Sequence, residues 1–193
     1  MFTFIQSLEI DYSSHIAFVA IGIIILKLSS MKYPGLKLLP SSKNLKLFVL
    51  LSLVFVAIQV GTTQFGSQSI VSLVSREGLV PVILLILFEG VFVGWTEEFL
   101  FRGCIQRALS ARFPSKTKLR ISYGTVFASL IFGAVHLLNL SLGQPLPTTA
   151  VQVSFAVFFG LLIGWFYEKK EDLAAAAWIH NINDFLATVI PFI

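Results

Sequence analysis

Long apolar runs separated by short polar segments dominate the 193-residue chain. A helix needs about 20 mostly apolar residues to cross the hydrocarbon core of a bilayer. We identify six candidate spans, and the third, which continues through Glu97, is too long for one straight crossing. They cover residues 16–31, 45–62, 79–113, 122–140, 148–167 and 173–193. The sequence therefore predicts an all-α fold, a polytopic membrane helix bundle.

The composition supports a membrane protein. Charged residues make up 12% of the chain, whereas soluble domains contain roughly 25%. Apolar residues make up 56%, and the mean hydropathy is +0.86. A chain with so few polar side chains cannot cover a soluble surface, which excludes a soluble Rossmann-type enzyme and a disordered protein. The single cysteine, Cys104, excludes an internal disulfide and a cysteine-rich zinc site, and we expect it to be a small core residue.

The basic residues predict the orientation of the chain. They gather in segments 27–46, 107–120 and 169–170, whereas the opposite side has Arg76 alone. The positive-inside rule places these three segments in the cytoplasm and both termini outside. The charge is thus a topology signal, and we expect no nucleic-acid partner. Residues 1–15 have no basic residue, so we expect them to be retained rather than cleaved as a signal peptide.

We expect one membrane domain over residues 1–193. Residues 1–78 form its periphery, with two spans and a polar segment, 63–76, that is either a loop or an interfacial helix. Residues 79–193 form a four-helix core that carries the candidate functional residues. His15 precedes the first span, and we expect it at the interface with no assigned role.

Ionisable residues inside the predicted spans are the candidate functional residues. Each costs at least about 2.5–3.5 kcal/mol to insert, so such residues mark a function by default. Glu98 and Arg102 are four residues apart, which predicts an ion pair on one helix face. Glu97 points about 100° away and has no partner at helical spacing. It is therefore either neutral or held by groups from other helices.

Two other spans carry histidines at similar depth. Glu97 lies 16 residues before Phe113 and His136 lies 16 residues after Arg120, so both are about 24 Å from the same loop. Antiparallel neighbours joined by that loop would bring them level. In the last span, His180 and Asp184 are four residues apart and share a helix face, so the carboxylate can orient the imidazole.

Four motifs in this order resemble a known family. Glu97-Glu98-x-x-x-Arg102 is followed by Phe132-x-x-x-His136, Phe155-x-x-x-Phe159 and His180-x-x-x-Asp184. The set is similar to that of the CPBP family of intramembrane proteases, also called the Abi or CAAX-protease-like family. The matching motifs extend from Trp95 to Asp184, nearly half of the chain.

The resemblance implies a membrane-embedded endopeptidase. Glu97 would be the general base, and His136 would help to position the attacking water. His180 and Asp184 would stabilise the developing oxyanion, and Glu98 and Arg102 would be structural. Three aromatic residues are candidates for the cavity wall, with core packing as the alternative for the last two: Phe132, Phe155 and Phe159.

Several alternatives remain open at this point. We expect no cofactor, although Glu97, His136 and His180 together offer a His₂Glu set for zinc. The partners would be the lipid bilayer and a peptide or protein substrate at the membrane, which we expect to be the plasma membrane of a prokaryote. The rival functions are a non-catalytic immunity or interaction protein of the same fold and a small proton or ion transporter.

Overall fold

The protein is described by a computed structural model that covers residues 4–32, 34–35, 37–62, 69–118 and 120–192, with backbone alone for 4–11. Within these ranges the structure contains helices, turns and an isolated β-bridge between Lys116 and Ser122, and no strand. Five described helical segments are long and apolar enough to cross a membrane, and the apolar helix Tyr12–Leu28 is shorter. The all-α, polytopic helix bundle predicted from the sequence is confirmed.

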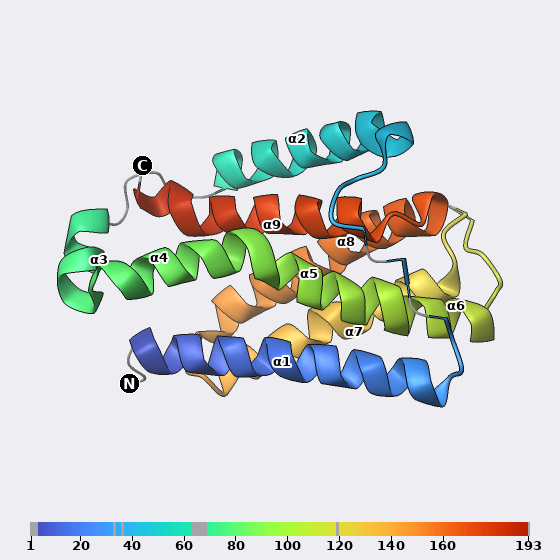
Figure 1. The fold of residues 1–193 in the computed structure, drawn as a ribbon, viewed down its shortest axis with the longest axis horizontal. Helices are drawn as coiled ribbons and strands as arrows, with labels where there is room; N and C mark the ends of the chain where they lie inside the picture. Colours follow the sequence, from blue (N-terminus) through green and yellow to red (C-terminus); the bar gives the residue numbers. More distant parts are fainter. Residues whose placement is uncertain (1–3, 33, 36, 63–68, 119, 193) are drawn as a thin grey trace.

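The helices run alongside one another in a layered bundle (Figure 1). The α1 and α2 helices lie on opposite sides of a central group formed by the later helices, with α2 against α9. The α-helices are α1 (Phe4–Leu28), α2 (Leu45–Thr62), α3 (Ile70–Glu77), α4 (Leu79–Leu87), α5 (Val93–Glu98), α6 (Arg107–Arg112), α7 (Tyr123–Val135), α8 (Leu146–Lys170) and α9 (Leu173–Val189). Short 3₁₀ turns cover Ser42–Asn44 (η1), His136–Leu140 (η4) and Ile190–Phe192 (η5).

The third predicted span is one helical segment of 34 residues, Leu79–Arg112. Two π-helical stretches interrupt it, Phe88–Phe92 (η2) and Phe99–Gln106 (η3). A π-helical turn shifts the hydrogen-bond ladder by one residue and is often found at functional sites. Glu97 and Glu98 lie between the two stretches, at the end of α5.

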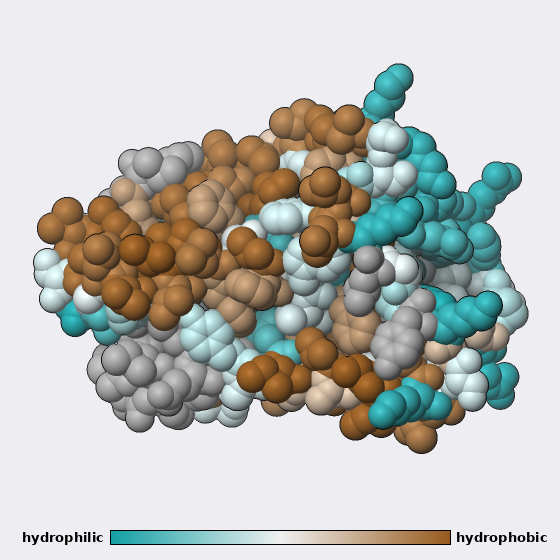
Figure 2. Space-filling model, in the orientation of Figure 1, coloured by the Kyte–Doolittle hydropathy of each residue, from teal (hydrophilic) through white to brown (hydrophobic). Residues whose placement is uncertain are grey.

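The two ends of the bundle differ in polarity. Both termini lie at one end, and the loops that contain the predicted basic segments lie at the other (Figure 1). Hydrophilic residues gather at that second end, whereas apolar residues cover much of the remaining visible face (Figure 2). This arrangement agrees with an even number of crossings and with the orientation that the charges predict.

The N-terminal helices, which we expected at the periphery, lie on the outside of the central group and pack closely against it. Leu51 and Phe55 of α2 belong to the main hydrophobic core. Gln59 of α2 also donates a hydrogen bond of 2.9 Å to the Asn183 side chain of α9. The polar segment expected at 63–76 contains α3, which begins at Ile70, and residues 63–68 lie outside the described ranges.

Helix α9 starts at a residue that anchors it to the N-terminal part of the chain. The Asp172 carboxylate caps the helix by accepting a hydrogen bond of 3.1 Å from the Ala175 N–H. Its other oxygen accepts hydrogen bonds from the Ser41 N–H and the Asn44 side chain, at 2.9 and 2.8 Å. Four consecutive alanines, residues 174–177, follow the cap and are at most 1% exposed. Their small size allows α9 to approach its neighbours closely.

Candidate active site

A buried ion pair forms the base of the candidate site. Arg102 Nε lies 3.0 Å from Glu98 Oε2, and the two side chains are 2% and 0% exposed. The guanidinium also donates a hydrogen bond of 3.3 Å to the Gly160 carbonyl of α8, and it lies over the Phe132 ring. Two charges buried at this depth require such mutual compensation. The i, i+4 pair predicted from the sequence is therefore present.

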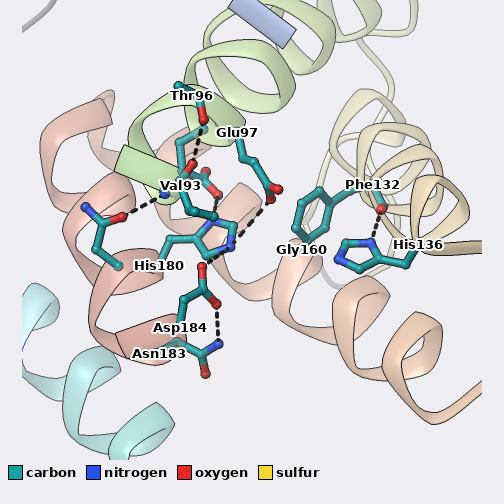
Figure 3. A network of polar contacts seen from close by, with 12 residues as sticks. Val93, Thr96, Glu97, Phe132, His136, Gly160, His180, Asn183 and Asp184 are labelled. Carbon is teal, nitrogen blue, oxygen red and sulfur yellow. Dashed lines mark hydrogen bonds and ion pairs between the residues drawn. The ribbon is translucent and has the colours of Figure 1, made fainter. Parts of the chain in front are cut away.

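Glu98 also fixes the orientation of the His180 ring. His180 Nδ1 lies 2.8 Å from Glu98 Oε1, so the imidazole donates its Nδ1–H to this carboxylate. The second ring nitrogen, Nε2, then points towards Glu97 and Asp184. It lies 3.6 Å from Glu97 Oε2 and 3.3 Å from Asp184 Oδ2 (Figure 3). The sequence predicted the contact with Asp184 but not the one with Glu98.

Asn181 connects α9, the helix that carries His180, to α5 by two hydrogen bonds. Its side-chain oxygen accepts a hydrogen bond of 2.7 Å from the Gly94 N–H, and its nitrogen donates one of 2.9 Å to the Val91 carbonyl. These two backbone groups lie where the π-helical stretch η2 meets α5. The residue after His180 thus sets the register between the two helices that carry Glu97 and His180.

We predict that Gly94→Ala separates these helices. A Cβ atom at this position would lie 2.5 Å from the Ala177 carbonyl oxygen and 2.6 Å from Asn181 Oδ1. Since the first of these is backbone, the helices must move apart, at a cost of about 1–3 kcal/mol or more. A lower melting temperature in detergent would show this. Gly90→Ala is the matched control, because its Cβ would meet the movable Phe185 side chain at 3.2 Å, and an equal effect of both changes would contradict the prediction.

Glu97 lies between two imidazoles, each near a different oxygen. His180 Nε2 is 3.6 Å from Oε2, and His15 Nε2 is 3.4 Å from Oε1. The Glu97 side chain is 12% exposed, so it lies at the edge of the packed core. Groups from other helices contact the Glu97 carboxylate, which is one of the two alternatives that its spacing left open. His15 was expected at the interface without a role, and the structure instead buries it beside Glu97.

His136 reaches the same region from the end of α7. Its Nδ1 donates a hydrogen bond of 2.9 Å to the Phe132 carbonyl, four residues earlier. In a neutral imidazole this leaves Nε2 as a hydrogen-bond acceptor. Figure 3 shows the His136 ring on the far side of the Phe132 ring from His180.

A cavity of about 500 Å³ brings these residues together. All four predicted catalytic residues line it: Glu97, His136, His180 and Asp184. His15 and Glu89 supply further ionisable side chains to its lining, and Asn139 and Gln152 supply amides. A cavity of this volume, with a few convergent polar groups, is typical of a binding site for a small molecule or a peptide segment.

The three aromatic residues expected to form the cavity wall lie elsewhere. Phe132 and Phe159 are both 2% exposed, and neither they nor Phe155 lines the cavity among the residues described. The Phe159 and Phe132 rings pack against the imidazole of His180, at 4.8 and 5.7 Å between centroids. These aromatic side chains therefore support His180 from behind and belong to the hydrophobic core.

The side chains considered for zinc are not grouped as a metal site among the described residues. Within the described part of the chain, no three His, Cys, Asp or Glu side chains are grouped so that they could hold one. The Nδ1 atoms of His136 and His180 are both engaged in hydrogen bonds, with Phe132 and Glu98 respectively. Nε2 of each ring is the single nitrogen that a zinc-bound histidine would use, and Glu97, the third side chain of the set, is in contact with His15.

Two residues of the site were missed in the sequence, for different reasons. His15 precedes the apolar run that begins at Ile16, so hydropathy alone placed it outside the membrane. Its spacing of three from Phe18 was an available sign of a helix face, and the two rings are in edge contact. Asn181 stands beside His180 in the motif, and its role depends on the backbone of another helix, which the sequence does not show.

Comparison with known proteins identifies the family. No curated protein and no solved structure matches the chain. The sequence profile of a family described as "Type II CAAX prenyl endopeptidase Rce1-like" matches residues 79–186, which is more than half of the chain. The match includes α4 to α8 and most of α9, and so contains Glu97, His136, His180 and Asp184. The chain therefore belongs to the Rce1-like family of CAAX-protease-like integral membrane enzymes.

Proposed function

We propose that this protein is an intramembrane endopeptidase in which Glu97 activates a water molecule. The proposal rests on the position of the Glu97 carboxylate. It lines a cavity of about 500 Å³ inside the bundle, within 3.6 Å of an imidazole whose other nitrogen is held by a buried carboxylate. A carboxylate with access to water and a fixed hydrogen-bond donor beside it are the groups that amide hydrolysis requires.

The proposed reaction starts with a water molecule between Glu97 and His136. The Nε2 of neutral His136 accepts one hydrogen bond from this water and thereby orients it. Glu97 takes one of its protons while the oxygen attacks the carbonyl carbon of the scissile bond. When the C–N bond breaks, Glu97 returns the proton to the leaving amine, so one amide and one water become a carboxylic acid and an amine.

His180 is the proposed donor to the oxyanion. In its doubly protonated form the imidazole donates Nδ1–H to Glu98 and Nε2–H into the cavity. The nearby carboxylates of Glu97, Glu98 and Asp184 compensate the charge of that form. Asp184 accepts hydrogen bonds, since the Asn183 side chain donates to its Oδ1 at 3.1 Å. We therefore assign Asp184 the role of holding the His180 ring rather than donating to the oxyanion.

The residues that line the cavity indicate the side of the membrane from which a substrate enters. The lining includes Leu138, Asn139, Ser141 and Leu142, in the segment that leads from α7 to α8 at the end of the bundle where the termini lie. Among the described lining residues, none comes from the basic segments 27–46, 107–120 and 169–170. Since these segments mark the cytoplasmic face, we propose that the substrate segment enters from the opposite, outer face.

This proposed entry side predicts a directional result. The cleavable segment can be fused to either side of an unrelated single-span anchor that carries a reporter. We expect cleavage when the segment is on the outer face and no cleavage when it is in the cytoplasm. Cleavage confined to the cytoplasmic fusion would contradict both the orientation and the proposed entry.

The proposed mechanism also predicts that a metal is not needed. The purified protein should keep its full rate of cleavage after treatment with a strong zinc chelator, because each proposed step uses a side chain of this chain. The measurement is the initial rate before and after treatment, with a zinc peptidase as the positive control. Loss of activity that returns when zinc is added would contradict a mechanism without metal.

The experiment that tests the function is comparative peptidomics of cells with the wild-type protein or Glu97→Gln. The proposed peptidase predicts a set of cleaved peptides or new protein termini that disappears in the variant, with equal amounts of both proteins in the membrane. Identical peptide sets would instead support a non-catalytic protein of the same fold.

A further inference from the structure

His15 occupies a buried place beside the proposed general base. It is 9% exposed, and its Nε2 lies 3.4 Å from Glu97 Oε1. The Ser14 hydroxyl lies 3.3 Å from the other ring nitrogen, Nδ1. The rings of Phe88 and Phe18 stand edge-on to the imidazole, at 5.0 and 5.4 Å between centroids. Ring packing, the hydrogen bond with Ser14 and the contact with Glu97 thus restrict the orientation of the imidazole.

The helix that carries His15 is held in register with the catalytic helices. A Cβ atom on Gly22 of α1 would lie 2.6 Å from the Phe99 ring, so close contact at this point requires glycine. One turn further, Leu26 is 2% exposed and packs in a small core with Phe99 and Cys104. These contacts fix the axial position of α1 relative to the helix that carries Glu97. The helix lies outside the matched residues 79–186, so the motifs of the family do not include His15.

From this geometry we infer that His15 is a positioning residue for Glu97, an inference that rests on the proposed peptidase function. The imidazole directs Nε2 at Oε1 of the carboxylate across 3.4 Å, while Oε2 faces His180 and the cavity. With one oxygen held in this way, the carboxylate plane cannot rotate freely, and a lone pair of Oε2 stays directed at the water. The N-terminal helix, which the sequence placed at the periphery, thereby completes the active site.

A positioning role predicts a loss in turnover rather than in substrate binding. A displacement of about 1 Å in a catalytic group can cost on the order of 10²-fold in rate. We expect His15→Phe, which keeps an aromatic ring between Phe88 and Phe18, to lower kcat by roughly 10- to 100-fold, with KM changed by less than about threefold. His15→Gln can still donate a hydrogen bond, and we expect it to recover most of this loss.

Chemical rescue separates positioning from a structural role. His15→Ala removes the ring next to a cavity that His15 itself lines. Added imidazole can enter the vacated space and donate to Glu97, so we expect the rate of His15→Ala to rise with imidazole concentration while the wild-type rate does not. Leu26→Ala is the matched control on the same helix. It loosens the packing of α1 without removing a group beside Glu97, so it should lower the melting temperature, and imidazole should not restore any loss in its kcat.

The outcomes distinguish this inference from the proposed function. If Glu97→Gln abolishes cleavage while His15→Phe cleaves at the wild-type rate, the inference is wrong and the function stands. An equal loss in His15→Phe and His15→Gln, with no rescue of His15→Ala by imidazole, also overturns the inference. If Glu97→Gln cleaves like the wild type, the proposed function itself fails.

Discussion

Purified Glu97→Gln protein is expected to cleave its substrate at least about 10³-fold more slowly than the wild type. Glutamine has nearly the same shape as glutamate, but its amide cannot take a proton from water. The side chain is 12% exposed and is in contact with His15 and His180, and the amide oxygen can still accept a hydrogen bond from one of these two imidazoles. The fold should therefore persist. The measurement is the initial rate of cleavage together with the melting temperature in the same detergent.

A second lining residue provides the control for this change. Ser141 lines the same cavity, and its hydroxyl donates a hydrogen bond to the Leu138 carbonyl rather than to a proposed catalytic group. Ser141→Ala should leave the rate within about twofold of the wild type, since a surface hydroxyl of this kind contributes little. If both variants slowed cleavage alike, the cavity would be sensitive to any change and Glu97 would have no special role.

Arg102→Met is expected to destabilise the protein by about 3–5 kcal/mol, because it leaves Glu98 as a buried carboxylate without its cation. Arg102 Nε lies 3.0 Å from Glu98 Oε2, and this carboxylate is fully buried. The change also removes the hydrogen bond to the Gly160 carbonyl of α8. A large drop in melting temperature, or loss of the protein from the membrane fraction, is the expected result.

The double variant Arg102→Met with Glu98→Gln tests the cause. Removing the charge of Glu98 together with that of Arg102 eliminates the unpaired carboxylate, so stability should return in part. The double variant would still lack normal activity, since His180 loses its charged partner at Nδ1. If the double variant were less stable than Arg102→Met alone, the ion pair would not be the source of the destabilisation.

Much of the fold followed from the sequence because the membrane imposes simple rules. Span lengths follow from bilayer thickness, and orientation follows from the placement of lysine and arginine. The spacing of Glu98 and Arg102 predicted their ion pair, since partners four residues apart lie on one helix face. The intervals from Glu97 and His136 to a shared loop likewise placed both residues at one depth, and both line the cavity.

Other features depend on contacts between distant segments, which hydropathy cannot show. The starting point of α1 was placed at residue 16 because Ser13, Ser14 and His15 are polar, yet the helix includes them and turns His15 towards Glu97. The sequence did not show whether Phe132, Phe155 and Phe159 face the cavity or the hydrophobic core. The place of Phe132 and Phe159 behind His180 follows from the packing of α7 and α8, where Gly160 allows close contact with Ser129.

The partner of His180 illustrates a limit of motif spacing. Asp184, four residues after His180, is the carboxylate nearest to it in the sequence. The spacing therefore predicted that Asp184 orients the imidazole ring. In the structure Glu98 takes that place at Nδ1, because Asn181 brings α9 against α5 at Gly94. The contact between Glu98 and His180 depends on the register between α5 and α9. That register is set by backbone groups at a π-helical turn, and the spacing of residues within α9 does not show it.

The most direct test of the account follows the peptide bond itself. The purified wild-type protein, reconstituted in lipid with a substrate found by peptidomics, is incubated in water enriched in oxygen-18, and the products are weighed by mass spectrometry. The account predicts two product peptides, one with the heavy oxygen in its new carboxylate, and neither product with Glu97→Gln. An intact substrate with the wild-type protein, or the same labelled products with both proteins, would contradict it.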